Sequence, residues 1–192
     1  MYKDIFWERF MTYLKRSIAA LLFSGTALSA VANSNYYSDR TLWDVYPYLG
    51  IDVQNIDYWA SRDRIDMIGV VGGLQFNDYL GLELNWSQNT GKVGILNEGQ
   101  FSEEIKIKHY GVGVTFQADL YQRLYAKSYV GYGKIEAEKV FKEDVITAKL
   151  GLGYQISPDF AVEATYNNSF TNDPIKGYAN SNGAGIQLKY YF

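Results

Sequence analysis

Hydrophobic and polar residues alternate along most of the chain after residue 44. An alternation with a period of two places one set of side chains on each face of an extended strand. The segment 79–87 shows the pattern most clearly, because its apolar set is Leu80, Leu82, Leu84 and Trp86 and its other set is Gly81, Glu83, Asn85 and Ser87. The pattern therefore predicts β-strands rather than helices.

Eight segments show this alternation, most of them over about 8 to 11 residues, the length that a tilted strand needs to cross a bilayer. Strand-forming residues dominate the whole region, and no stretch has a convincing helical period. The predicted strands are 45–54, 66–76, 79–87, 106–118, 124–135, 146–155, 162–167 and 182–192.

The connections between these strands alternate in length. Short connections are predicted at 77–78, 120–123 and 157–159, and long ones at 55–63, 88–104, 136–144 and 168–181. Outer-membrane barrels with an even number of strands have tight periplasmic turns and long extracellular loops. The predicted fold class is therefore all-β, an eight-stranded antiparallel up-and-down transmembrane β-barrel.

Alternation alone does not say which face is inside, but the glycines do. Gly111, Gly113, Gly131, Gly133, Gly151 and Gly153 share a face with charged and amide residues, while the opposite face carries bulky apolar residues. Small and polar residues suit a narrow lumen, and bulky apolar residues suit lipid. The alternative is a soluble barrel of the lipocalin kind, which would place its apolar side chains inside.

The start of the chain predicts a secretory signal peptide. Lys15 and Arg16 precede a short apolar stretch, and Ala30-Val31-Ala32 forms a small-x-small cleavage site. Residues 1–32 are therefore predicted to be the signal peptide and residues 33–192 the barrel domain. Asp4 and Glu8 suit a signal poorly, which suggests that translation starts at Met11.

Composition excludes several classes of partner. Removal of residues 1–32 leaves 14 basic and 19 acidic residues, a net charge of about −5. A mildly acidic chain without a basic stripe argues against binding to nucleic acid. The chain has no cysteine and a single histidine, so a protein metal site is not expected, and no cofactor is predicted.

Six charged residues are predicted to point into the lumen. Eight strands leave an interior just wide enough for side chains, and buried charges need partners. We therefore expect a packed polar core of paired charges, with a gated small-solute pore as the alternative. The predicted lumen residues are Asp52, Glu83, Lys127, Lys149, Glu163 and Lys189.

The Gly-x-Gly segments 129–133 and 151–154, the signal peptide and the terminal aromatic residue together resemble the small outer-membrane barrel family that includes the OmpA transmembrane domain and the OmpX/Ail proteins, a porin-like family. The resemblance covers the whole mature chain. It implies the outer membrane of a Gram-negative bacterium and lipid as the surroundings. It also implies that Leu188, Tyr190 and Phe192 form the signal read by the outer-membrane insertion machinery.

The extracellular rim carries two sets of candidate contacts. Lys106, Lys108 and Lys134 lie beyond the apolar band on the outer face and could bind lipopolysaccharide phosphates, or could be ordinary solvated lysines. The predicted loops contain aromatic residues that suit adhesion or binding of a host or extracellular ligand, or that pack together to stiffen the barrel. The candidate loop contacts are Trp59, Phe101, Phe141 and Phe170.

A lipid A-modifying hydrolase is the least favoured alternative. His109 and Ser87 could supply a base and a nucleophile, but both point into the lumen by parity, whereas such enzymes act at the lipid face. The sequence therefore predicts a non-enzymatic barrel that is structural or interacts with the cell's surroundings through its loops.

Overall fold

The computed structural model describes residues 45–59, 61, 64–91, 95–97, 100–102, 105–138, 140–171 and 178–192, with only the backbone described at 95–97 and 100–102. The predicted signal peptide lies outside these residues. The described part contains no helix of the length and apolarity needed to cross a membrane.

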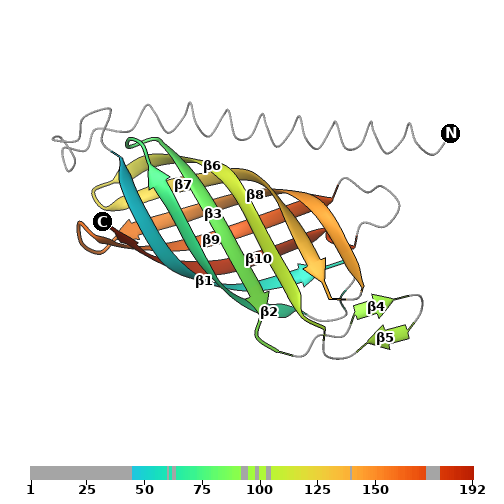
Figure 1. Cartoon of the computed structure of the whole chain (residues 1–192). Coiled ribbons are helices and arrows are strands. Elements are labelled where there is room, and N and C mark those ends of the chain that lie inside the picture. The colour runs from blue at the N-terminus through green and yellow to red at the C-terminus, as the bar shows by residue number, and fades with distance from the viewer. Residues whose placement is uncertain are drawn as a thin grey trace.

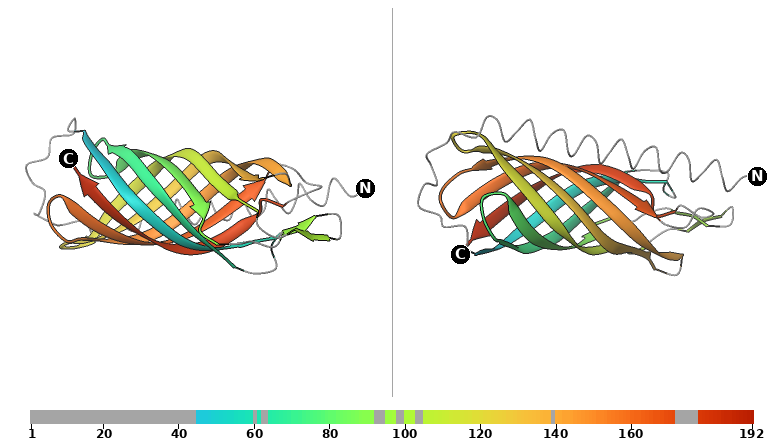
Figure 2. Two further views of the ribbon diagram at one scale, coloured as in Figure 1. Left: turned by 60° about the horizontal axis from the view of Figure 1, so that its bottom comes forward. Right: turned by 90° about the horizontal axis from the view of Figure 1, so that it is seen from above.

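Eight strands form a closed barrel in which every neighbouring pair is antiparallel (Figures 1 and 2). Around the barrel their order is β1-β10-β9-β8-β7-β6-β3-β2, so the first and last strands close the sheet. The predicted fold class is confirmed. The strands are β1 (Tyr46–Tyr58), β2 (Ile65–Gln75), β3 (Leu80–Asn89), β6 (Ile107–Tyr121), β7 (Leu124–Ala137), β8 (Phe141–Gln155), β9 (Phe160–Thr171) and β10 (Ser181–Tyr191).

The long connection between β3 and β6 contains two further strands, β4 (Ile95–Asn97) and β5 (Gln100–Ser102). They pair with each other as a separate two-stranded sheet, which the sequence analysis had treated as part of a loop. This hairpin stands beyond the end of the barrel that carries the long connections (Figures 1 and 2).

The predicted inner and outer faces are confirmed. Leu49 and Leu84 on the outer face are 56% and 58% exposed, whereas Glu83 on the inner face is 1% exposed. Charged groups inside and exposed apolar groups outside are the reverse of a soluble barrel. The structure thus has the polarity of a barrel surrounded by lipid.

Two groups of outward aromatic side chains border the apolar band. Girdles of aromatic residues at both interfaces are typical of outer-membrane barrels. Toward the long connections lie Trp86, Tyr110, Tyr132 and Tyr166, and toward the short turns lie Phe116, Tyr154, Phe160 and Tyr190. We call the first set the outer aromatic row. Together the two sets mark where the membrane begins and ends.

Several strands are longer than predicted. Near the long connections their outward residues become polar and their inward residues become apolar, the reverse of the pattern in the apolar band. In β1, Asn55 and Asp57 point outward and are exposed, whereas Ile56 and Tyr58 point inward and are buried. The prediction ended this strand at residue 54 because it followed outward apolar residues. β8 likewise begins at Phe141 rather than at residue 146.

The inward residues of this end form a compact hydrophobic core, here called the outer apolar cluster. The Tyr58 hydroxyl donates to Met67 Sδ at 3.2 Å, so even its buried phenol has a partner. This end of the barrel is therefore built like a soluble barrel, with a largely apolar interior. The outer apolar cluster consists of Ile56, Tyr58, Ile65, Met67, Ile105, Ile107, Ile135, Ala137, Val145 and Ala179.

Nearer the short turns, the lumen is filled by tyrosine rings that lie against glycines. Tyr125 is the cross-strand partner of Gly153, and Tyr48 is the partner of Gly73. A Cβ atom at Gly153 would overlap the ring of Tyr125. The glycines on the inner face are therefore needed for the rings to fit.

We expect Gly153→Ala to destabilise the barrel by about 1–3 kcal/mol, the usual effect of overpacking. Gly72→Ala is a matched control in another strand, because its new Cβ would meet only Tyr48 O at 3.5 Å and Leu49 Cδ1 at 3.6 Å. Urea unfolding in lipid vesicles, followed by tryptophan fluorescence, measures both. Equal stability losses in the two variants would contradict the requirement for glycine at position 153.

Candidate functional site

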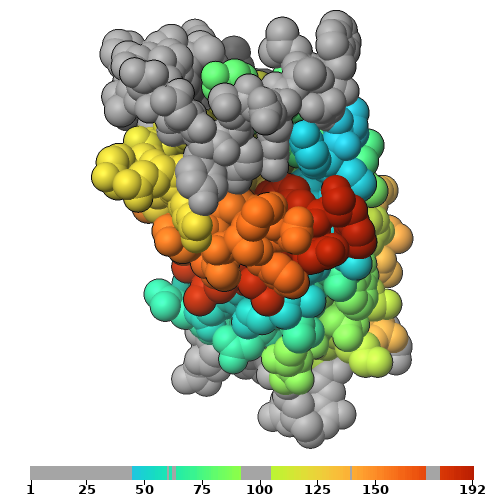
Figure 3. Space-filling view, turned by 90° about the vertical axis from the view of Figure 1, so that its left-hand side faces the viewer, coloured from blue at the N-terminus to red at the C-terminus, as the bar shows by residue number. Residues whose placement is uncertain are grey.

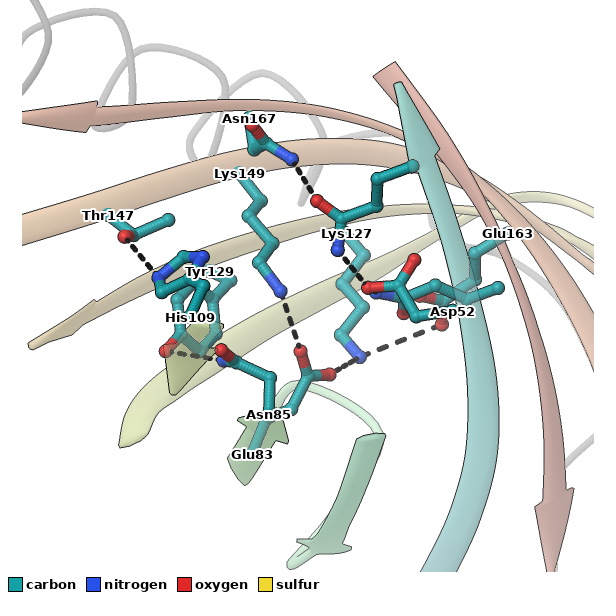
Figure 4. A network of polar contacts seen from close by, with 12 residues as sticks. Asp52, Glu83, Asn85, His109, Lys127, Tyr129, Thr147, Lys149, Glu163 and Asn167 are labelled. Carbon is teal, nitrogen blue, oxygen red and sulfur yellow. Dashed lines mark hydrogen bonds and ion pairs between the residues drawn. The ribbon is translucent and has the colours of Figure 1, made fainter. Parts of the chain in front are cut away.

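Five charged side chains from five strands meet inside the barrel, here called the lumenal ion cluster (Figure 4). Lys189 Nζ lies 2.7 Å from Glu163 Oε2 and 3.2 Å from Glu83 Oε2. Lys127 Nζ lies 2.8 Å from Glu83 Oε2 and 3.6 Å from Glu163 Oε1, and Lys149 Nζ lies 3.6 Å from Glu83 Oε1. The predicted separate pairs are thus one shared network.

The lumenal ion cluster is buried and has further partners. Glu83 and Glu163 are each 1% exposed, and Lys189 is fully buried. The Tyr48 hydroxyl donates to Glu83 at 2.9 Å, and the Tyr125 hydroxyl donates to Glu163 at 2.8 Å. Buried ion pairs need good geometry and extra hydrogen bonds to offset desolvation, and the inward tyrosines supply those bonds.

Asp52, the sixth predicted lumen charge, is held by amides instead. Gln54 Nε2 donates to Asp52 Oδ2, as does Gln187 Nε2 at 3.1 Å. Gln54 in turn accepts from Asn167 Nδ2 at 2.7 Å (Figure 4). The structure therefore brings all six predicted residues into one lumen, but Asp52 belongs to a neighbouring amide network that parity alone did not reveal.

Lys149 is the least well bound of the three lumenal lysines. Its Nζ has no hydrogen-bond partner among the residues that the structure describes, and it lies 4.7 Å from the ring centre of Tyr129. A cavity of about 10 Å³ borders Lys149, Gln187 and Thr165, which is about the space of a single water. The lumen at this level is packed, and nothing larger fits beside the ammonium group.

Ser87 and His109 lie opposite each other on β3 and β6, between the lumenal ion cluster and the outer apolar cluster. His109 Nε2 lies 3.5 Å from Thr147 Oγ1, which is itself 2.9 Å from Ser169 Oγ. No hydrogen bond joins Ser87 to His109 in the described chain, and both are buried. Lipid outside the barrel does not reach either side chain.

The three rim lysines are not equivalent. Lys134 Nζ lies 3.0 Å from Asp144 Oδ1, and Lys142, which the sequence analysis did not consider, lies 3.3 Å from Glu136 Oε2. Lys106, just before β6, and Lys108, on β6, are exposed and form no ion pair within the described residues. The expected cluster of three cations is therefore reduced to two by an acidic neighbour.

The predicted loop contacts fall into different environments. Trp59 is 80% exposed at the end of β1, and Phe170 is 45% exposed on the outer face of β9. Phe141, the first residue of β8, stacks on Tyr178 with ring centres 6.0 Å apart, so it ties β8 to the last long connection. Phe101 lies in β5, but its side chain is outside the described residues.

The predicted insertion signal lies on the outer face of β10. Leu188, Tyr190 and Phe192 are all exposed, at 41%, 38% and 69%. The Tyr190 ring is 4.9 Å from those of both Phe160 and Phe192.

No group of acidic or histidine side chains in the part of the chain that is described is arranged to bind a metal ion.

The lumenal ion cluster predicts unequal effects of neutralising its lysines. Lys189→Met leaves two buried carboxylates short of a partner and should cost about 3–5 kcal/mol. Lys149→Met removes an ammonium group without a hydrogen bond, and we expect a loss of less than about 1.5 kcal/mol. Urea unfolding in lipid vesicles compares the two, and a larger loss for Lys149→Met would refute this order.

Comparisons with known proteins agree with this architecture. Residues 18–192 match the family model described as the outer membrane protein beta-barrel domain. Search of curated protein sequences finds no match.

Among solved structures, Neisserial surface protein A is 12% identical with a TM-score of 0.52, over 77% of this chain and 97% of that one. OprG from Pseudomonas aeruginosa is 11% identical with a TM-score of 0.52, over 78% and 96%. The N-terminal barrel domain of Pseudomonas aeruginosa OprF is 13% identical with a TM-score of 0.50, over 76% and 97%. Such low identities show a common fold alone. Since the family match spans nearly all of the chain, the protein belongs to the outer membrane β-barrel family and is located in the bacterial outer membrane.

Proposed function

We propose that this protein is a non-enzymatic, non-conducting barrel of a Gram-negative outer membrane that is structural and interacts with the surroundings through its extracellular end. The observation that carries the proposal is the filled interior. Charged groups block the middle of the lumen, and the outer apolar cluster blocks its extracellular end.

Both ends of the lumen support a barrel without a permanent channel. Met67, Ile107 and Ile135 in the outer apolar cluster are completely buried, so apolar side chains fill this part of the lumen. Tyr48 and Tyr191 pack together with ring centres 5.3 Å apart near the short turns. Figure 3 shows this end of the molecule, where residues of the short turns and of β10 lie together.

The extracellular end is a stiff platform on which a recognition surface can be carried. Trp59 N donates to Asn180 O at 3.0 Å, which ties the end of β1 to the last long connection. Ala179 N donates to Glu143 Oε2 at 3.2 Å, and Phe141 stacks on Tyr178. Trp59 stands out from this bonded frame and is the best described candidate for contact with an extracellular or host ligand.

The remaining partners follow from membrane insertion. The outward residues of the apolar band would contact lipid, and the exposed aromatic end of β10 would be read by the insertion machinery. These contacts use the outer face and the last strand, so they leave the extracellular end available for a ligand.

A small-solute pore is the second candidate, because the carboxylates of the lumenal ion cluster are shared. Lys127 and Lys189 each lie within 4.0 Å of both Glu83 and Glu163, so small movements could exchange their partners. Conduction would also require the outer apolar cluster to open. A lipid A hydrolase is less favoured, because Ser87 and His109 are buried and not bonded to each other.

The filled lumen predicts that purified protein in planar lipid bilayers shows no discrete conductance steps. The charge-reversal variant Glu83→Lys should also remain silent as long as it folds, since the outer apolar cluster is unchanged. Folding of each sample is checked by its shift in gel mobility on heating. Steps in the wild type that change frequency in the variant would support the pore instead.

Exposure of Trp59 predicts that Trp59→Ala lowers adhesion of bacteria producing the protein to an epithelial cell layer, with unchanged barrel stability. Tyr121→Ala is the matched control, because Tyr121 is a 69% exposed aromatic residue at the opposite, short-turn end. Adhesion is counted against bacteria lacking the protein. Equal adhesion by bacteria that produce the wild-type, Trp59→Ala or Tyr121→Ala protein would refute a surface role for Trp59.

A further inference from the structure

The outward residues of β6 change character in a fixed order toward the extracellular end. Phe116, Val114 and Val112 are exposed apolar residues, Tyr110 and Lys108 follow, and Lys106 comes next, just before the start of the strand. Successive outward residues of a strand are about 6–7 Å apart along it. Lys108 and then Lys106 therefore follow Tyr110 directly on its extracellular side.

The outer aromatic row fixes the level of these lysines in the membrane. Tyr110 is the cross-strand partner of Trp86 on β3, and Tyr132 on β7 is the partner of the neighbouring Val112. Aromatic belts sit at the level of the lipid headgroups. Lys108 and Lys106, one and two outward positions further, are thus at the height of headgroup phosphates.

Among the described residues, no ion pair involves either lysine, although Glu138 lies beside Lys106 and donates its backbone N–H to Lys106 O at 2.9 Å. The cross-strand neighbours of Lys108 are Gln88 on β3 and Glu136 on β7. The Glu136 carboxylate is already bound to Lys142 at 3.3 Å, and the Asp144 carboxylate to Lys134 at 3.0 Å.

The adjoining part of the rim, next to β3, carries carboxylates instead. There β1 and β2 present exposed Asp57 and Asp66, and Asp66 accepts from Asn55 at 2.7 Å. Acidic neighbours on β2 therefore border the cationic site, and the lysines on its other side, Lys134 and Lys142, are already paired with carboxylates.

We propose that Lys106 and Lys108 bind the phosphate groups of a phosphorylated glycolipid of the lipid A type, with Trp86 and Tyr110 against its apolar part. A lysine ammonium group binds phosphate as a point charge, and the adjacent aromatic side chains hold the lipid beside it. The proposal rests on the membrane orientation in the proposed function but not on ligand binding by the loops.

The test uses the folded full-length mature protein in phosphatidylcholine nanodiscs containing diphosphoryl lipid A or its dephosphorylated form. Native mass spectrometry and a lipid titration measure binding. K106Q/K108Q should bind the diphosphoryl lipid about thirtyfold more weakly than wild type, since each lysine near an anionic surface contributes about 1 kcal/mol. Binding of the dephosphorylated lipid should be weak in all forms.

K134Q/K142Q is the matched control, because it removes the same number of charges from lysines that already have carboxylate partners. We expect its affinity to remain within about threefold of wild type. Equal losses of lipid affinity in the two double variants would show that only the net charge matters, and would overturn the proposed site. Unchanged binding by K106Q/K108Q would also overturn it.

Inorganic phosphate separates the two sources of the phosphate group. If millimolar phosphate displaced the lipid and itself bound as tightly, the site would be one for free phosphate, and the lipid assignment would be wrong. Loss of lipid binding in K106Q/K108Q with normal cell adhesion would leave the proposed function of the loops unaffected. Loss of adhesion in Trp59→Ala with normal lipid binding would leave the present site standing.

Discussion

The width of an eight-stranded barrel constrains the rest of this structure, because the interior holds side chains but little water. Charges placed there must find partners within the protein. Glycines on one strand make room for tyrosine rings from the next, and those rings reach the carboxylates, as Tyr125 does over Gly153 to Glu163. Removing the space, the ring or the charge therefore disturbs the same assembly.

The lipid boundary is the second constraint, and it explains why one barrel has two kinds of interior. Within the membrane, Val53 faces lipid and Asp52 faces the lumen. Two residues further, Asn55 faces solvent, and Ile56 then packs inside. The strand keeps its period while the outside changes from lipid to water. The outer apolar cluster is thus the expected core of the part that leaves the membrane, and it closes the lumen as a consequence.

Much of the fold could be predicted from the sequence because a period of two is visible without any contact information. Parity placed Glu83 and Lys189 on the correct face, yet it could not say that one carboxylate is shared by three lysines, since that depends on strand stagger and rotamers. Strand ends were missed where the polarity reversed. The pairing of Lys134 with Asp144 was missed because it joins residues across a hairpin whose register the turn had to set.

The lipid-facing surface and the lumen make different demands on the sequence. This difference explains how the chain can share its fold with structural neighbours that are only 11–13% identical. The alternation can be satisfied by many residues on the lipid side. Only the narrow lumen demands particular partners, and those residues lie away from the extracellular end. Trp59, Lys106 and Lys108 are exposed beyond the apolar band, so these positions can change while the lumen stays the same. The extracellular end is therefore the part of this chain that the fold constrains least.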